Sequence, residues 1–147
     1  MTERASRVLA IDLGTVRAGL AISDPLRLTA QPAGHLKRVG IARDLAALRA
    51  IVDEREIATV VVGYPLLMSG EAGAAAKEIE SFVARLAGVV ACPVVLWDER
   101  LTTVQARRAL LEGDVSRRKR RQVVDAAAAT VLLQSWLDAQ TAGSSST

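Results

Sequence analysis

The order of five predicted strands along the chain limits the possible folds more than any other feature. Four of them are short, predominantly apolar runs, which is typical of buried strands, whereas the third contains Pro32 and Gly34 and is expected to be an edge strand. The first two are separated only by "GTVR", which favours an antiparallel pair. The last two follow long intervening stretches and are expected to run parallel to their neighbours. The runs lie within residues 7–13, 18–23, 29–38, 57–63 and 92–99.

Helical periodicity fills the stretches between the later strands. Leu45, Leu48 and Val52 form one stripe within a predicted helix at 41–56, and apolar residues from Ala76 to Leu86 mark a second. Two more helices are predicted at 102–113 and at about 122–139. Together these elements predict an α/β fold with a five-stranded mixed sheet, three antiparallel strands followed by two parallel ones, and helices on both faces.

Length and composition are those of one small domain. The chain has 147 residues, of which 50% are hydrophobic, enough for a substantial core. We expect a single domain over residues 1–139 and a disordered polar tail over 140–147. No run approaches the roughly 18 uncharged apolar residues of a membrane span, and "MTERASR" lacks the apolar segment of a secretory signal. The sequence therefore predicts a cytoplasmic protein with no membrane partner.

Carboxylates stand where the predicted strands end. Asp12 ends the first strand, Asp98 and Glu99 end the last, and Asp125 lies among small residues in "VVDAAAAT". Ligands of such sheets collect beyond the carboxyl ends of the parallel strands, and an alanine-rich helix can approach a sheet closely. Gathered carboxylates repel one another unless a cation neutralises them, and Mg²⁺ prefers oxygen ligands. Two such ions on one phosphodiester activate water and stabilise the leaving oxygen.

Basic residues are concentrated in one segment. Residues 100–121 carry eight basic and two acidic side chains, within a chain of net charge +3. A focused positive patch attracts polyanions, because neutralised phosphates release their counterions. The alternative is a solvated loop. We expect residues 117–121 to form a mobile loop that contacts nucleic acid through Arg117, Arg118, Lys119, Arg120 and Arg121.

Four stretches together resemble the YqgF/RuvX family of Holliday-junction-resolvase-like proteins and pre-16S rRNA nucleases. They occur in the family's order and cover most of residues 7–138: "AIDLGTVRAGLAISDPL", "VVGYPLLMSGEAG", "VVLWDERLTTVQARRAL" and "RKRRQVVDAAAATVLLQSWLD". The resemblance implies an RNase H-like fold and cleavage of nucleic-acid phosphodiesters with Mg²⁺ or Mn²⁺, as two ions. It also implies maturation of the 5′ end of 16S ribosomal RNA, with Holliday-junction resolution as the alternative.

Position by position, the resemblance assigns catalysis and metal coordination to Asp12, Glu99 and Asp125. Asp98 either replaces Glu99, supports it, or caps the following helix. Arg17 matches the family's basic position in the first turn, where the preceding lysine of many members is Val16 here. Arg100 either contacts nucleic acid with the basic stretch or pairs with Asp98.

Other functions remain open at this point. "DLGT" also resembles the first phosphate loop of actin-like and sugar-kinase ATPases, but those enzymes need two lobes and 147 residues supply one. A non-catalytic, ribosome-associated module that binds nucleic acid is the stronger rival. The sequence leaves open RNA (pre-rRNA) or branched or single-stranded DNA as the substrate, internal or terminal cleavage, association with the ribosome, and a monomer or a homodimer.

Overall fold

The computed structural model describes residues 6–101 and 117–145, with the backbone alone for 117–125 and 142–145. Five strands form one sheet in the order β3-β2-β1-β4-β5. β1 and β2 pair antiparallel, as do β2 and β3, whereas β4 runs parallel to both β1 and β5. The predicted mixed sheet is confirmed. The strands are β1 (Arg7–Leu13), β2 (Arg17–Ser23), β3 (Ala30–Lys37), β4 (Ile57–Tyr64) and β5 (Val94–Asp98).

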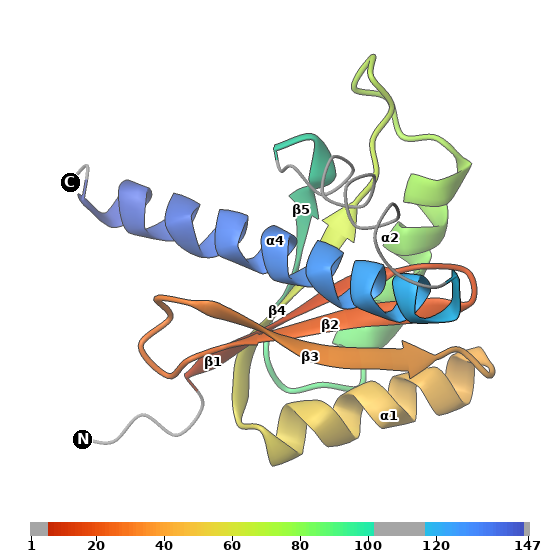
Figure 1. Ribbon diagram of the computed structural model, residues 1–147, viewed down its shortest axis with the longest axis horizontal. Coiled ribbons are helices and arrows are strands. Elements are labelled where there is room, and N and C mark those ends of the chain that lie inside the picture. The colour runs from red at the N-terminus through yellow and green to blue at the C-terminus, as the bar shows by residue number, and fades with distance from the viewer. Residues whose placement is uncertain (1–5, 102–116, 146–147) are drawn as a thin grey trace.

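Helices cover both faces of the sheet, as the sequence predicts (Figure 1). α1 (Ile41–Glu54) and α2 (Ala74–Ala87) lie on one face, and α4 (Arg117–Ser145) crosses the other. A short 3-10 turn, η1 (Glu99–Leu101), follows β5. The helix expected at 102–113 lies outside the described residues.

Alternation along β1 separates two apolar cores. Leu9 and Ile11 pack with α1 and α2, whereas Val8 and Ala10 pack beneath α4. The residues of α4 that meet the sheet include Ala128 and Ala129, both fully buried. Because an alanine adds little bulk beyond the backbone, the helix axis can lie close to the sheet.

The last helix is longer than the sequence predicts. We expected it to cover about 122–139, but α4 runs from Arg117 to Ser145. Residues 117–121 are therefore the first turns of a helix rather than a loop. Arginine and lysine are good helix formers, and no proline or glycine interrupts the segment before Gly143. At the other end, helix formers such as Ala139, Gln140 and Ala142 carry the helix into the predicted tail.

The helices of the described ranges include none that is both long and apolar enough to cross a membrane.

Candidate functional site

Asp12 lies at the carboxyl end of β1, on the face that α4 covers. It has the same strand parity as Val8 and Ala10, which pack beneath α4. Asp12 is only 7% exposed. A carboxylate this buried is stable as an anion only where cations or hydrogen-bond donors compensate its lost hydration.

Glu99 folds back over β4 at Gly63. A Cβ atom placed on Gly63 would lie 2.9 Å from Oε2 of Glu99 and 3.2 Å from its Cγ. Gly63 follows Val62 in β4 and shares the strand parity of Val61, which packs beneath α4. The Glu99 carboxylate therefore occupies, on the α4 face, the space that a side chain at residue 63 would fill.

The strand register brings Asp12 and Glu99 toward one another. Ile11 pairs with Val62, so Asp12 and Gly63 come next on neighbouring strands. Gly63 in turn pairs with Trp97 of β5, two residues before Glu99. Adjacent strands lie about 4.8 Å apart. The carboxylate of Glu99 thus lies over the strand next to Asp12, with no side chain between them at residue 63.

Asp125 lies in α4, one turn before the residues that pack on the sheet. Residues 125, 128, 129 and 132 share one stripe of the helix, and Ala128, Ala129 and Leu132 are buried. α4 contacts β1, β2 and β3, and its N-terminal part lies toward the β1–β2 hairpin (Figure 1). The backbone at residue 125 is therefore on the sheet-facing stripe of the helix, near the strand end that carries Asp12.

The carboxylates of Asp12 and Glu99 suit a hard divalent cation, and for the third predicted ligand, Asp125, the structure describes the backbone alone. Asp12 and Glu99 offer only carboxylate oxygens, which Mg²⁺ and Mn²⁺ prefer. Among side chains that the structure describes, no group of three or more His, Cys, Asp or Glu residues is placed to hold a metal ion. Two of the three predicted ligands therefore share one face at the strand ends, and the third is placed by its backbone alone.

Asp98 differs from Glu99 in both direction and partner. Asp98 lies opposite Tyr64, whose side chain packs on the α1 and α2 face. Its carboxylate accepts hydrogen bonds from the backbone N–H, Nε and Nη2 of Arg100, the last at 2.8 Å. The hydrogen bonds from Arg100 lower the pKa of Asp98 below its ordinary range. Of the alternatives for Arg100, the ion pair with Asp98 is confirmed, and Asp98 caps the η1 turn.

The predicted nucleic-acid contacts fall at two places along the site. Arg17 begins β2 and is half-buried, directly after the hairpin turn that follows Asp12. In this turn the N–H of Gly14 donates to the carbonyl of Arg17 at 2.9 Å, and a Cβ on Gly14 would lie 2.7 Å from that oxygen. The turn therefore requires glycine. Residues 117–121 begin α4, where the structure describes only their backbone.

Arg38 and Asp44 support the same hairpin turn, and sequence reasoning missed both. Nη1 of Arg38 donates to the carbonyl oxygen of Gly14 at 2.9 Å, and its Nε lies 3.3 Å from Asp44. Asp44 is 2% exposed and also accepts the N–H of Val39. The guanidinium lies over the ring of Phe82, 5.6 Å from its centre. No local pattern marks these residues, because each looks like an ordinary surface charge near a helix start.

The chain is similar to known proteins over most of its length. A protein of Myxococcus xanthus named "Putative pre-16S rRNA nuclease" is 48% identical over 90% of this chain and 88% of its own length. A protein of Geobacillus kaustophilus with the same name is 48% identical over 91% of this chain and 99% of its own. The solved structure of Thermus thermophilus RuvC in complex with a Holliday junction substrate covers 92% of this chain and 96% of its own, with a TM-score of 0.59 and 15% identity.

At 15% identity, the similarity to RuvC concerns the fold alone. The fold is RNase H-like, as the resemblance in sequence implies. The sequence profile described as "RuvX: Holliday junction resolvase" matches residues 6–139, nearly the whole chain. The two relatives, at 48% identity over most of their length, agree with this profile match. The chain therefore belongs to the RuvX family.

Proposed function

We propose that this protein is a metal-dependent nuclease that hydrolyses phosphodiesters in the 5′-end maturation of pre-16S ribosomal RNA. The observation that carries the proposal is the pair of carboxylates, Asp12 and Glu99, on one face at the strand ends, with Gly63 leaving room between them. The names of the curated relatives support the RNA substrate. In this proposal, the domain of residues 1–139 carries the activity. It acts in the cytoplasm, on RNA bound to ribosomal particles.

The proposed catalytic group consists of Asp12, Glu99 and Asp125, which hold two divalent ions, Mg²⁺ or Mn²⁺. Bound ions of this kind lower the pKa of water and stabilise the leaving oxygen of a phosphodiester. The chain's own part is to fix the oxygen ligands. The strand end fixes Asp12, and the space above Gly63 receives Glu99. The close approach of α4 at Ala128 and Ala129 supports a third ligand from the backbone position of residue 125, on the side of the β1–β2 hairpin.

The experiment that tests the activity compares three substrates. Single-stranded RNA with a pre-16S 5′ sequence, DNA of the same sequence, and a four-way DNA junction are incubated with Mg²⁺, with Mn²⁺ or with chelator. We expect metal-dependent cleavage of the RNA by wild type and roughly 1,000-fold less by Asp12→Asn, whose neutral amide is a poor metal ligand. Equal cleavage by both proteins contradicts the catalytic assignment.

Junction resolution is the second candidate, favoured by the description of the matching family profile. Preferred cleavage of the four-way junction over RNA supports it. Binding without cleavage of any of the three substrates supports instead a non-catalytic module. Sedimentation of the active protein, with and without substrate, decides between a monomer and a homodimer.

The basic residues are proposed to hold the substrate backbone. Arg17 lies beside the hairpin turn, and the first turns of α4 carry Arg117, Arg118, Lys119, Arg120 and Arg121. Arg100 contributes less, because Asp98 already takes its guanidinium. Replacing residues 117–121 with glutamine is expected to weaken RNA binding and to flatten its dependence on salt, by about 0.7 in log-log slope for each lost phosphate contact. An unchanged slope means that these residues do not contact phosphates.

A further inference from the structure

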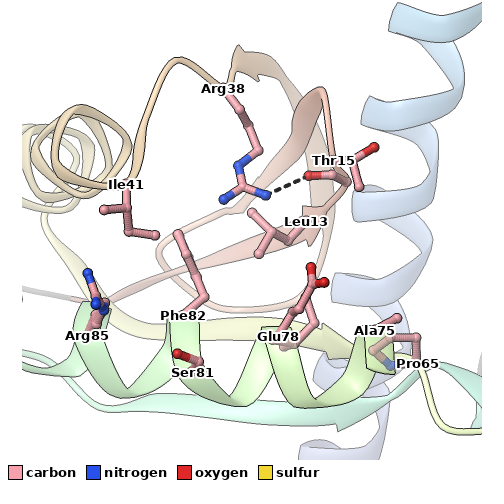
Figure 2. A pocket seen from close by; sticks show the side chains of 12 residues that line it. Leu13, Thr15, Arg38, Ile41, Pro65, Ala75, Glu78, Ser81, Phe82 and Arg85 are labelled. Atoms are coloured by element: carbon pink, nitrogen blue, oxygen red, sulfur yellow. Dashed lines mark hydrogen bonds between the residues drawn. The ribbon is translucent and has the colours of Figure 1, made fainter. Parts of the chain in front are cut away.

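A hollow of about 480 Å³ lies on the face opposite the carboxylates, at the same end of β1 (Figure 2). Its walls come from the hairpin turn at Leu13 to Thr15, from the connection between β3 and α1, and from one side of α2. Its volume is within the roughly 300 to 1,000 Å³ of small-ligand sites. Of the proposed metal ligands whose side chains the structure describes, Asp12 and Glu99, neither lines this hollow.

One wall carries a guanidinium that the fold holds in place. Arg38 donates to the carbonyl of Gly14, pairs with Asp44 and lies over Phe82. These hydrogen bonds engage Nε and one N–H of Nη1, whereas a guanidinium has five N–H donors. Arg38 therefore keeps donors for a ligand and loses little freedom when it binds one.

The α2 wall supplies groups of different chemistry at helical spacing. Glu78, Ser81 and Arg85 are exposed and line the hollow, and Phe82 lies between them with its ring buried. Figure 2 shows Glu78 and Arg38 directed toward the same space from two walls, with Leu13 and Phe82 at its apolar side. A fitting ligand combines an anionic group for Arg85, hydrogen-bond acceptors for the remaining N–H groups of Arg38, a flat apolar part, and hydrogen-bond donors for Glu78.

The position of the hollow relates it to the carboxylates. Leu13 lines it, and Asp12, the preceding residue, points to the opposite face. The two sites therefore lie on the two sides of one strand end. A nucleic-acid strand that crosses this end of the sheet can place one phosphate at the carboxylates and a neighbouring nucleotide in the hollow.

We infer that this hollow binds one nucleotide of the substrate strand, adjacent to the phosphate that is cleaved. A nucleotide has the required parts: a phosphate for Arg85, base or ribose acceptors for the remaining N–H groups of Arg38, a planar base for the apolar wall, and base or ribose donors for Glu78. The inference rests on the proposed nuclease function.

Binding is tested first without metal, so that the result does not depend on cleavage. Wild type in chelator is titrated with adenosine 5′-monophosphate, adenosine and inorganic phosphate while backbone amide resonances are recorded. We expect the nucleotide to bind at least about 10-fold more tightly than either part, since both sets of contacts are made together, with shifts at Gly14, Thr15 and α2. Equal, weak shifts with all three ligands, or shifts confined to α4, overturn the inference.

Two variants of α2 then connect the hollow to the reaction. Arg85→Gln removes a lining charge, and Lys77→Gln removes an equal charge from the same helix outside the hollow. We expect Arg85→Gln to raise the KM for RNA roughly 5-fold, as for one charge-assisted hydrogen bond, with kcat unchanged. Lys77→Gln is expected to behave as wild type.

The outcomes separate this inference from the nuclease proposal. If wild type cleaves RNA but the two variants have the same KM, the hollow is not on the substrate path and the inference fails while the nuclease proposal stands. If wild type cleaves no substrate, the nuclease proposal fails. In that case a nucleotide bound in the metal-free titration belongs to a separate small-molecule site, and the assignment to a substrate strand fails as well.

Discussion

The acidic residues on the two faces of the sheet have different neighbours. On the α1 and α2 face, Asp98 is paired with Arg100 and Asp44 with Arg38. On the α4 face, Glu99 fills the space above Gly63, on the strand next to that of Asp12. Glu99 and Asp98 are adjacent in sequence, yet each belongs to a different face.

The difference lies in what each carboxylate adjoins: Asp98 adjoins Arg100, whereas Glu99 adjoins the strand next to that of Asp12. A carboxylate paired with an arginine of its own chain is already neutralised, so it contributes to the fold and has little affinity for an added cation. Glu99 lies on the face of Asp12, over the neighbouring strand, so one divalent ion could reach oxygens of both. Asp98 lies on the other face, and the proposed metal ligand at the end of β5 is therefore Glu99.

The largest expected effect comes from removing the negative charge of Glu99, compared with removing that of Asp98. Glu99→Gln is expected to lower metal-dependent kcat/KM for RNA by roughly 100- to 1,000-fold, about 3 to 4 kcal/mol of transition-state stabilisation. Asp98→Asn leaves Glu99 in place and is expected to cost less than about 10-fold. Single-turnover cleavage with saturating Mg²⁺ measures both. A greater loss in Asp98→Asn than in Glu99→Gln reverses the assignment.

The sequence predicted the sheet and the positions of its acids because both depend on local pattern. The continuous apolar run in 7–13 places Asp12 at a strand end, and the short "GTVR" turn favours an antiparallel partner. Local pattern also explains the error in α4: five consecutive charges suggested a loop, although arginine and lysine favour helix. The helix propensity of the side chains was the better guide there.

The contacts between distant elements did not follow from sequence. The approach of Glu99 to Gly63 depends on the register of β4 against β5, and that of Arg38 to Gly14 depends on the path between β3 and α1. A glycine inside the β-branched run "TVVVGY" was the one available signal, since it often marks a close approach. It did not reveal which side chain approaches.

Gly63→Ala tests whether the space above residue 63 positions the Glu99 carboxylate. The added methyl would lie 2.9 Å from the Glu99 carboxylate, so the flexible side chain of Glu99 must move. We expect a 10- to 100-fold loss of activity, about 1.4 to 2.7 kcal/mol, as for a displaced metal ligand. The melting temperature should change little. Higher metal concentration should restore part of the activity, and a metal titration of cleavage rate measures this.

Gly73→Ala is the matched control for that substitution. Gly73 has a negative φ of −83° and precedes α2, and a methyl there would meet Leu67 at 3.4 Å. We expect activity within about 2-fold of wild type, because no proposed ligand is displaced. An equal loss in both glycine variants would mean that Gly63 acts through general backbone stability rather than through Glu99.

Asp44→Asn tests the ion pair between Asp44 and Arg38 on the α1 and α2 face. The buried amide no longer compensates Arg38, whose side chain is 24% exposed and so regains part of its hydration. We expect a loss of about 1 to 2 kcal/mol in the free energy of unfolding, below the 3 to 5 kcal/mol of a fully buried pair. Urea denaturation measures it. Asp53→Asn on the same helix disrupts an exposed pair with Arg49 and should cost at most about 0.5 kcal/mol.

The smallest effect is the acid titration of Asp98. Its pKa is lowered, first by the side-chain hydrogen bond from Arg100. Because the folded-state pKa lies below that of the unfolded chain, the pair stabilises the fold above the ordinary aspartate pKa of about 4 and loses this contribution as pH falls through the lower folded value. Carboxyl ¹³C resonances followed from neutral pH to about pH 2 report the midpoint.

Arg100→Gln provides the comparison, since it removes the guanidinium and leaves Asp98 in place. The Asp98 midpoint should then return toward the ordinary aspartate range, while the arginine variant keeps most of its RNA cleavage. An Asp98 midpoint that is the same in both proteins means that the ion pair does not form in solution. In that case Arg100 does not hold Asp98 away from a bound cation, and Asp98 becomes a candidate metal ligand at the end of β5 beside Glu99.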